Sequence, residues 1–288
     1  MSNVHTLDLS GCNDLTGLQA LGNVHTLDLS DNDVDIDLSA LSGVNTLNLA
    51  RCYDLSGDVS ALRFVYDLCL SGCFNISDVR ALGNVHTLNL GYCKRINDFS
   101  ALSSVHNLDL SGTHVSDVSI FSRVHTLTLS SCPDVTDVGA LCNVHELDLS
   151  NSKNVLNAGS LSNVYKLNLS GTNVSDVSAL GNVYDLNLID CQQVVDVSAL
   201  GNVHVLHLRG THVSDVSALG NVYELSLANC KSVSDVSALV NVHTLDLSYC
   251  ANVNDVSALS NVRTLILTGC KAVTDLSGVK DVFDLWKP

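Results

Sequence analysis

Residues 242–261, VHTLDLSYCANVNDVSALSN, contain the pattern that decides the fold of this chain. The first six residues alternate apolar and polar side chains, which predicts a β-strand with Leu245 and Leu247 on its buried side. Asp255 precedes Val-Ser-Ala-Leu and can accept hydrogen bonds from the free N–H groups of one short 3₁₀-like turn. The remaining residues expected to point inward are Val253, Val256 and Leu259.

This stretch recurs along the whole chain of 288 residues, with a usual period of 20. Because a strand this short cannot bury its leucines alone, the copies must stack into a parallel sheet with one strand each. No change of composition marks a linker, so we expect a single domain over residues 1–288, with a partial copy from Val282. Copies one to fourteen begin at Val4, Val24, Val44, Val65, Val85, Val105, Val124, Val144, Val164, Val183, Val203, Val222, Val242 and Val262.

The repeated motif Val-x-x-Leu-x-Leu-x-x-Cys, with Thr for Cys in some copies, resembles the leucine-rich repeat from Val4 to about Leu285. The cysteine resembles the cysteine-containing subclass, and Asp-Val-Ser-Ala-Leu resembles the internalin-like subclass, although periods of 19–21 residues are shorter than usual for either. Such mixed repeats also resemble those of large DNA viruses of amoebae. The resemblance implies a parallel-stranded repeat solenoid that binds protein through its concave sheet. Because single 3₁₀-like turns on the convex side are narrow, we expect an α/β-type solenoid with few or no α-helices and slight curvature.

One turn position holds a small side chain with a hydrogen-bond donor in every copy. In the 19-residue copies six, nine and eleven, Thr-x-Val replaces Cys-x-x-Val, so the side chain and the loop length change together. We predict a buried ladder of reduced thiols and hydroxyls that donate to backbone carbonyl groups. No C-x-x-C pair is present, which argues against a zinc site, and we expect no metal and no cofactor. The ladder positions are Cys12, Asn32, Cys52, Cys73, Cys93, Thr113, Cys132, Ser152, Thr172, Cys191, Thr211, Cys230, Cys250 and Cys270.

The second residue of each copy is usually a histidine or a tyrosine. These rings should form a stripe beside the strands at a spacing of about 4.8 Å. A metal-binding or pH-sensitive stripe is one interpretation, and rings that pack over one another and cover the sheet edge are the other. Tyrosine cannot replace an imidazole ligand, which favours packing. The stripe holds His5, His25, Tyr66, His86, His106, His125, His145, Tyr165, Tyr184, His204, Tyr223 and His243.

The acidic composition limits the classes of partner. With 14 basic residues against 30 acidic ones, the net charge of −16 argues against nucleic acid or an anionic membrane as partner. The N-terminal residues show no secretory signal, and an odd total of 11 cysteines fits reduced thiols, so we expect a cytoplasmic protein, in a host cytoplasm if viral. No phosphate-binding loop, H-E-x-x-H motif or acid pair stands out from the repeat, so we expect no enzymatic activity.

The outward residues of the strands are usually Thr, then Asp or Asn, then Ser, and copies nine to twelve depart most from this rule. Exposed aliphatic, aromatic and arginine side chains together fit a binding hot spot, although drift on an unconstrained surface would give the same pattern. We predict a protein-interaction scaffold, or alternatively a self-assembling structural element joined end to end through its terminal strands. The partner-binding residues expected are Tyr165, Lys166, Tyr184, Asp185, Ile189, His204, Val205, His207, Arg209, Tyr223 and Glu224.

Overall fold

The computed structural model describes residues 4–12, 15, 17–32, 37–55 and 58–279, together with the backbone of residues 284–286. The chain divides into two compact units, residues 1–135 and 136–288. The start of the partial copy at Val282 lies outside the described residues. The prediction of a single domain stays a prediction.

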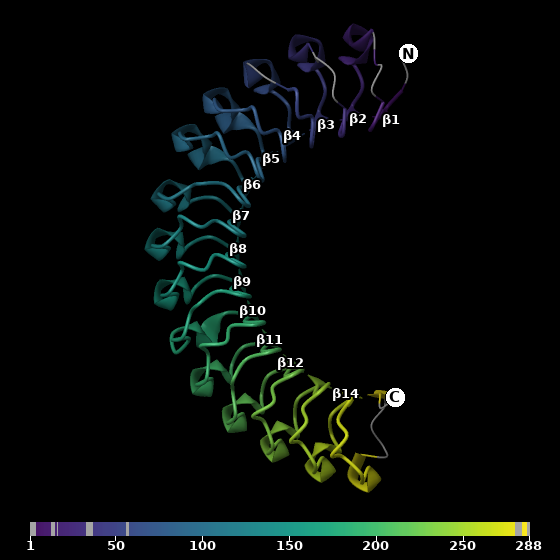
Figure 1. The fold of residues 1–288 in the computed structure, drawn as a ribbon, viewed down its shortest axis with the longest axis vertical. Helices are drawn as coiled ribbons and strands as arrows, with labels where there is room; N and C mark the ends of the chain where they lie inside the picture. The colour runs from purple at the N-terminus through teal and green to yellow at the C-terminus, as the bar shows by residue number, and fades with distance from the viewer. Residues whose placement is uncertain are drawn as a thin grey trace. The chain divides into compact units, whose positions relative to one another are not determined.

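Each copy contributes one three-residue strand, and within each unit consecutive strands pair in parallel (Figure 1). The register aligns equivalent residues of neighbouring copies, as Leu186 with Leu206 and Leu206 with Leu225. The predicted parallel sheet with one strand in each copy is confirmed. The first unit holds β1 (Thr6–Asp8), β2 (Thr26–Asp28), β3 (Thr46–Asn48), β4 (Asp67–Cys69), β5 (Thr87–Asn89), β6 (Asn107–Asp109) and β7 (Thr126–Thr128). The second holds β8 (Glu146–Asp148), β9 (Lys166–Asn168), β10 (Asp185–Asn187), β11 (Val205–His207), β12 (Glu224–Ser226), β13 (Thr244–Asp246), β14 (Thr264–Ile266) and β15 (Asp284–Trp286).

The return segments form 3₁₀ turns of three to five residues on the outer side of each unit, with the strands on the concave side (Figure 1). No α-helix occurs among the described residues, and none of their helices has the length and apolar character to cross a membrane. The predicted fold class is confirmed. The turns are η1 (Leu18–Leu21), η2 (Leu38–Leu41), η3 (Val59–Leu62), η4 (Arg80–Asn84), η5 (Ser100–Ser104), η6 (Ser119–Phe121), η7 (Gly139–Leu141), η8 (Gly159–Leu161), η9 (Leu180–Asn182), η10 (Ser198–Leu200), η11 (Ser217–Leu219), η12 (Ser237–Leu239), η13 (Ser257–Leu259) and η14 (Ser277–Val279).

The core of each copy lies between the strand and the return segment. In copy thirteen all five predicted inward residues are at most 2% exposed. The 3₁₀ turn of that copy is capped as predicted, because a side-chain oxygen of Asp255 accepts the N–H of Ser257 at 2.8 Å. Hydrogen bonds from the backbone and side chain of Ser257 lower the pKa of Asp255. Equivalent bonds from serine N–H groups at 2.9–3.0 Å recur at Asp98 and Asp196.

The residue before each ladder position has a positive φ in all fourteen copies. This left-handed turn lets the next N–H bond back to a leucine carbonyl of the same copy, as from Cys250 to Leu247 at 3.0 Å. Glycine adopts such a φ without strain, whereas other residues lose about 1–2 kcal/mol. Eight copies nevertheless use another residue, with φ between 57° and 63°: Asp31, Arg51, Tyr92, Ser131, Asn151, Asp190, Asn229 and Tyr249.

We call the residues with positive φ before the ladder positions the left-handed row. Steric contact with the preceding copy favours glycine at several positions of this row. A Cβ added to Gly112 would lie 2.6 Å from the ring of Tyr92, and one on Gly269 would lie 2.5 Å from the ring of Tyr249. The larger side chain of one copy therefore lies over a glycine of the next. The same arrangement recurs where Asn151 lies over Gly171, at the edge of the surface described below.

Candidate interaction surface

The ladder residues hold neighbouring copies together through backbone carbonyl groups. The thiol of Cys250 donates to the carbonyl of Leu227, in the preceding copy, at 3.0 Å. Threonine is too short to do the same, so the hydroxyl of Thr172 donates to Leu169 of its own copy at 2.7 Å. Every ladder residue except Cys12 is at most 2% exposed, so from Asn32 onward these small side chains form a buried row.

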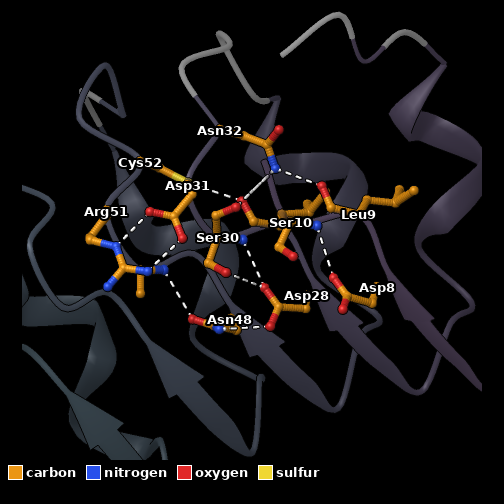
Figure 2. Close-up of polar contacts among 12 residues, drawn as sticks. Asp8, Leu9, Ser10, Asp28, Ser30, Asp31, Asn32, Asn48, Arg51 and Cys52 are labelled. Atoms are coloured by element: carbon orange, nitrogen blue, oxygen red, sulfur yellow. Dashed lines mark hydrogen bonds and ion pairs between the residues drawn. The ribbon is translucent and has the colours of Figure 1, made fainter. Parts of the chain in front are cut away.

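Asn32 links two copies through hydrogen bonds to backbone carbonyl groups. Its side-chain nitrogen donates to Leu9 of the preceding copy at 2.9 Å (Figure 2) and to Leu29 of its own copy at 2.8 Å. Its side-chain oxygen is buried and has no hydrogen-bond partner among the residues that the structure describes. Beside it, the exposed Arg51 and Asp31 of the left-handed row form a two-pronged ion pair at 2.5 Å (Figure 2).

Cys12 departs from the prediction of a buried ladder, because it is exposed. The other ladder thiols bond to a leucine carbonyl of the preceding copy, as Cys52 does to Leu29 and Cys73 does to Leu49. Two cysteines outside the ladder, Cys69 and Cys142, are half-buried.

Thiol labelling should follow this burial. Cys12 should react first, Cys69 and Cys142 more slowly, and the buried ladder thiols last. Burial raises the pKa of Cys93 from 9.0 to about 12, which lowers its thiolate fraction about a thousandfold. Mass spectrometry after timed alkylation of the native protein measures the order, with urea-unfolded protein as the control. Equal rates at Cys12 and Cys93 in the native protein would contradict the assignment.

The rings of the second position stack along the sheet edge, as one interpretation of the sequence expected. In the second unit the stack runs without interruption through His145, Tyr165, Tyr184, His204, Tyr223 and His243, with centroids 4.4–4.8 Å apart. The described residues contain no group of three or more His, Cys, Asp or Glu side chains placed to hold a metal ion. Within the second unit the stripe is a continuous row of stacked rings, and its side chains are partly or largely exposed.

The predicted hot spot lies within the second unit, and its aromatic members form the middle of that stack. Tyr165, Tyr184 and Tyr223 are each 40–45% exposed. The pKa of Tyr184 is raised, chiefly because the hydroxyl is partly removed from water and secondly because Tyr165 lies beside it. Lys166 and Asp185 lie on adjacent strands, and their charged groups approach to 3.6 Å. Two of the unusual strand residues therefore form an ion pair with each other within the protein.

The other predicted residues occupy the outward face of β10 to β12 and its edge. Register places Val205 between Asp185 and Glu224. The structure brings His207 onto the same strand as Val205, and Arg209 follows two residues later in an exposed position. The side chain of Arg209 forms no ion pair with any residue of the described ranges.

Ile189 does not lie with the ring stack but lines a hollow of about 680 Å³ at the turn edge of copies eight to ten. Sequence reasoning missed this hollow. The available signal was the residue after threonine in the three 19-residue copies. It is a histidine in two of them, His114 and His212, and an asparagine, Asn173, in the copy that lines the hollow. The lining residues are Asn151, Lys153, Ser170, Gly171, Thr172, Asn173, Ile189, Asp190, Gln192 and Gln193.

Comparison with known proteins supports the fold through structure rather than sequence. No protein-family model and no curated protein sequence matches this chain. An internalin, InlF, from Listeria monocytogenes is similar with a TM-score of 0.64 and 19% identity, over 99% of this chain and 86% of that one. The leucine-rich repeat protein LIC12759 of Leptospira interrogans is similar with a TM-score of 0.73 and 19% identity, over 100% of this chain and 84% of that one.

A third similar structure also has a cysteine ladder. The functional domain of InlJ from Listeria monocytogenes includes a cysteine ladder, and it matches with a TM-score of 0.53 and 18% identity, over 87% of this chain and 60% of that one. None of these three proteins gives support to a viral origin. The repeated strand motif, the in-register leucines and these likenesses together show that this chain has the leucine-rich repeat fold, built from short repeats with a cysteine ladder.

Proposed function

We propose that this protein is a non-enzymatic scaffold that binds a protein partner on the sheet face of copies nine to twelve. The observation that carries the proposal is the exposed ring stack of Tyr165, Tyr184, His204 and Tyr223, with Arg209 on the same group of copies. The similar solved structures, which are leucine-rich repeat proteins, favour the same class of function.

The chemistry of this surface suits protein recognition. Tyrosine and arginine are over-represented among residues that dominate binding energy at protein interfaces. Rings already fixed by stacking lose little conformational entropy when a partner covers them. The net charge of −16 opposes nucleic acid or anionic membrane as the partner. Free cysteines in a buried ladder support our further proposal of a reducing, cytoplasmic location.

Matched substitutions test the surface. Tyr184→Ala and Arg209→Glu should each weaken binding of the partner purified from the source organism by about tenfold or more, since interface hot spots cost this much when lost. Tyr66→Ala is the control, because Tyr66 occupies the same stripe position in another copy and stacks on His86 with centroids 4.4 Å apart. Calorimetric titration measures the affinities. Equal losses from Tyr66→Ala and Tyr184→Ala would refute the assignment to copies nine to twelve.

Self-assembly through the terminal strands is the alternative function, because an edge strand exposes unpaired N–H and C=O groups. At the N-terminal end, Leu7 and Leu9 are half-buried rather than buried, which leaves apolar surface beside that edge. Sedimentation velocity over a hundredfold range of concentration separates the two functions. A constant monomer mass supports the scaffold, and a mass that grows with concentration supports assembly.

A further inference from the structure

We propose that the hollow at the turn edge of copies eight to ten binds a carboxylate group of the partner protein, with Lys153 as the cation that recognises it. The inference rests on the proposed function, since it adds a chemically defined subsite to the same binding surface. Ile189, which belongs to the predicted partner-binding residues, lines the hollow. Its volume of about 680 Å³ lies within the range of about 300–1,000 Å³ typical of small-ligand sites.

The short loop beside the hollow carries a smaller side chain than its two equivalents. In copy six, Nδ1 of His114 lies 2.8 Å from a carboxylate oxygen of Asp134 in the next copy. In copy eleven, Nδ1 of His212 lies 2.7 Å from the carbonyl oxygen of Gln192 in the preceding copy. In copy nine, the amide nitrogen of Asn173 donates to the carbonyl oxygen of Lys153 in the preceding copy at 2.8 Å, and Asn173 lines the hollow.

Lys153 is held at two points, which places its ammonium group at the hollow. Its carbonyl oxygen accepts a hydrogen bond from the Asn173 side chain at 2.8 Å. Its Nζ donates to the carbonyl oxygen of Gly171. Lys153 forms no ion pair with any residue in the described part of the chain, so its charge is available to a ligand.

Gly171 lies beneath Asn151 and next to the ammonium group of Lys153. Its φ of 64° favours glycine, and a Cβ at this position would lie 2.6 Å from the side-chain oxygen of Asn151 and 3.6 Å from Nζ of Lys153. A side chain here would therefore collide with Asn151 and crowd the lysine, whereas glycine lets both side chains stay where they are.

The rest of the lining suits a carboxylate better than an aromatic ligand. Amide groups of Asn151, Gln192 and Gln193 can donate hydrogen bonds beside the ammonium group, and charge-assisted bonds of this kind are about twice as strong as neutral ones. Asp190 is the one acidic residue in the described lining. One of its carboxylate oxygens lies over Gly210 of copy eleven, 2.2 Å from the position that a Cβ on Gly210 would take. No described residue of the lining is aromatic, so a base or sugar ring would find no stacking surface.

Capped peptides test the proposal in the full-length protein. The probes are acetyl-Ala-Glu-Ala-amide, its Gln counterpart, and acetyl-Ala-Ala-Ala with a free C-terminal carboxylate. The readout is the saturation of amide chemical shifts at Gly171 and Gln192 in ¹⁵N NMR titrations. The Glu peptide or the free C-terminus should bind about tenfold or more tightly than the Gln peptide, and the tighter of the two identifies the source of the carboxylate.

Two substitutions and one control locate the site. Lys153→Gln should weaken binding of the carboxylate probe about tenfold, and Asn173→His should weaken it by placing a larger ring, as found in copies six and eleven, in the lining of the hollow. Lys231→Gln is the control, because Lys231 also follows a ladder residue but lies outside the hollow, and it should leave binding unchanged. Equal binding of the Glu and Gln peptides, no saturable shift, or unchanged binding by Asn173→His would overturn the proposal. Partner binding that stays sensitive to Arg209→Glu would then preserve the proposed function without this subsite.

Discussion

Replacing Asn32 with aspartate should destabilise the first copies by about 3–5 kcal/mol, because it leaves a buried charge without compensation. The amide nitrogen of Asn32 donates to the carbonyl groups of Leu9 and Leu29 at 2.9 and 2.8 Å. A carboxylate would turn both contacts into repulsion between oxygens. Hydrogen exchange at the amides of Leu29 and Leu49 measures the loss locally, where the terminal copies can unfold separately from the rest.

Asn32→Cys is the matched control for this substitution. It installs the commonest ladder residue of the chain and removes the buried side-chain oxygen that has no partner. An unsatisfied buried polar group costs about 1–3 kcal/mol, so this variant should be as stable as the natural protein or more so. Similar stability of the Asp and Cys variants would show that the ladder hydrogen bonds contribute little.

Replacing Leu206 with alanine should lower the free energy of unfolding of the second unit by about 2–5 kcal/mol. Leu206 is fully buried and lies in register between Leu186 and Leu225, so the cavity would open between three copies. Urea unfolding followed by circular dichroism measures the change, with the slope of the transition checked for loss of cooperativity.

Leu7→Ala is the comparison for that substitution. Leu7 holds the same position in copy one, where it is half-buried and pairs in register with Leu27 alone. Its loss should cost less than half as much as that of Leu206, because a terminal copy has one stacking neighbour. Equal costs at the two positions would contradict the view that each copy is stabilised chiefly by its neighbours.

The repeat made the fold predictable, because the period-two apolar pattern recurs in all fourteen copies and an Asp or Asn caps the short turn in every copy after the first. Leu245 and Leu247 point inward and Asp255 caps its turn, as expected from local sequence alone. The left-handed row was harder to predict. Its occupants include Arg51 and Tyr92, which rarely adopt positive φ, so local preference gives no sign of the turn.

The candidate site was only partly predictable, because its properties depend on contacts between copies. The histidines and tyrosines at the second position of the repeat predicted the ring stack, because equivalent residues of neighbouring copies must lie side by side. The ion pair of Lys166 with Asp185 and the hollow beside Asn173 appear only when adjacent copies are compared position by position. The burial of the other ladder thiols likewise depends on contact with the preceding copy, not on their own turns alone.

Site-specific photocrosslinking tests the central claim, that a protein partner covers the sheet face of copies nine to twelve. A benzoylphenylalanine replaces Val205 on that face or Val195, which is 59% exposed and lies in the return segment of copy ten. After irradiation with the purified partner, we expect a covalent complex from position 205 and little or none from position 195. Crosslinking that is equal at the two positions, or stronger at 195, would contradict the account.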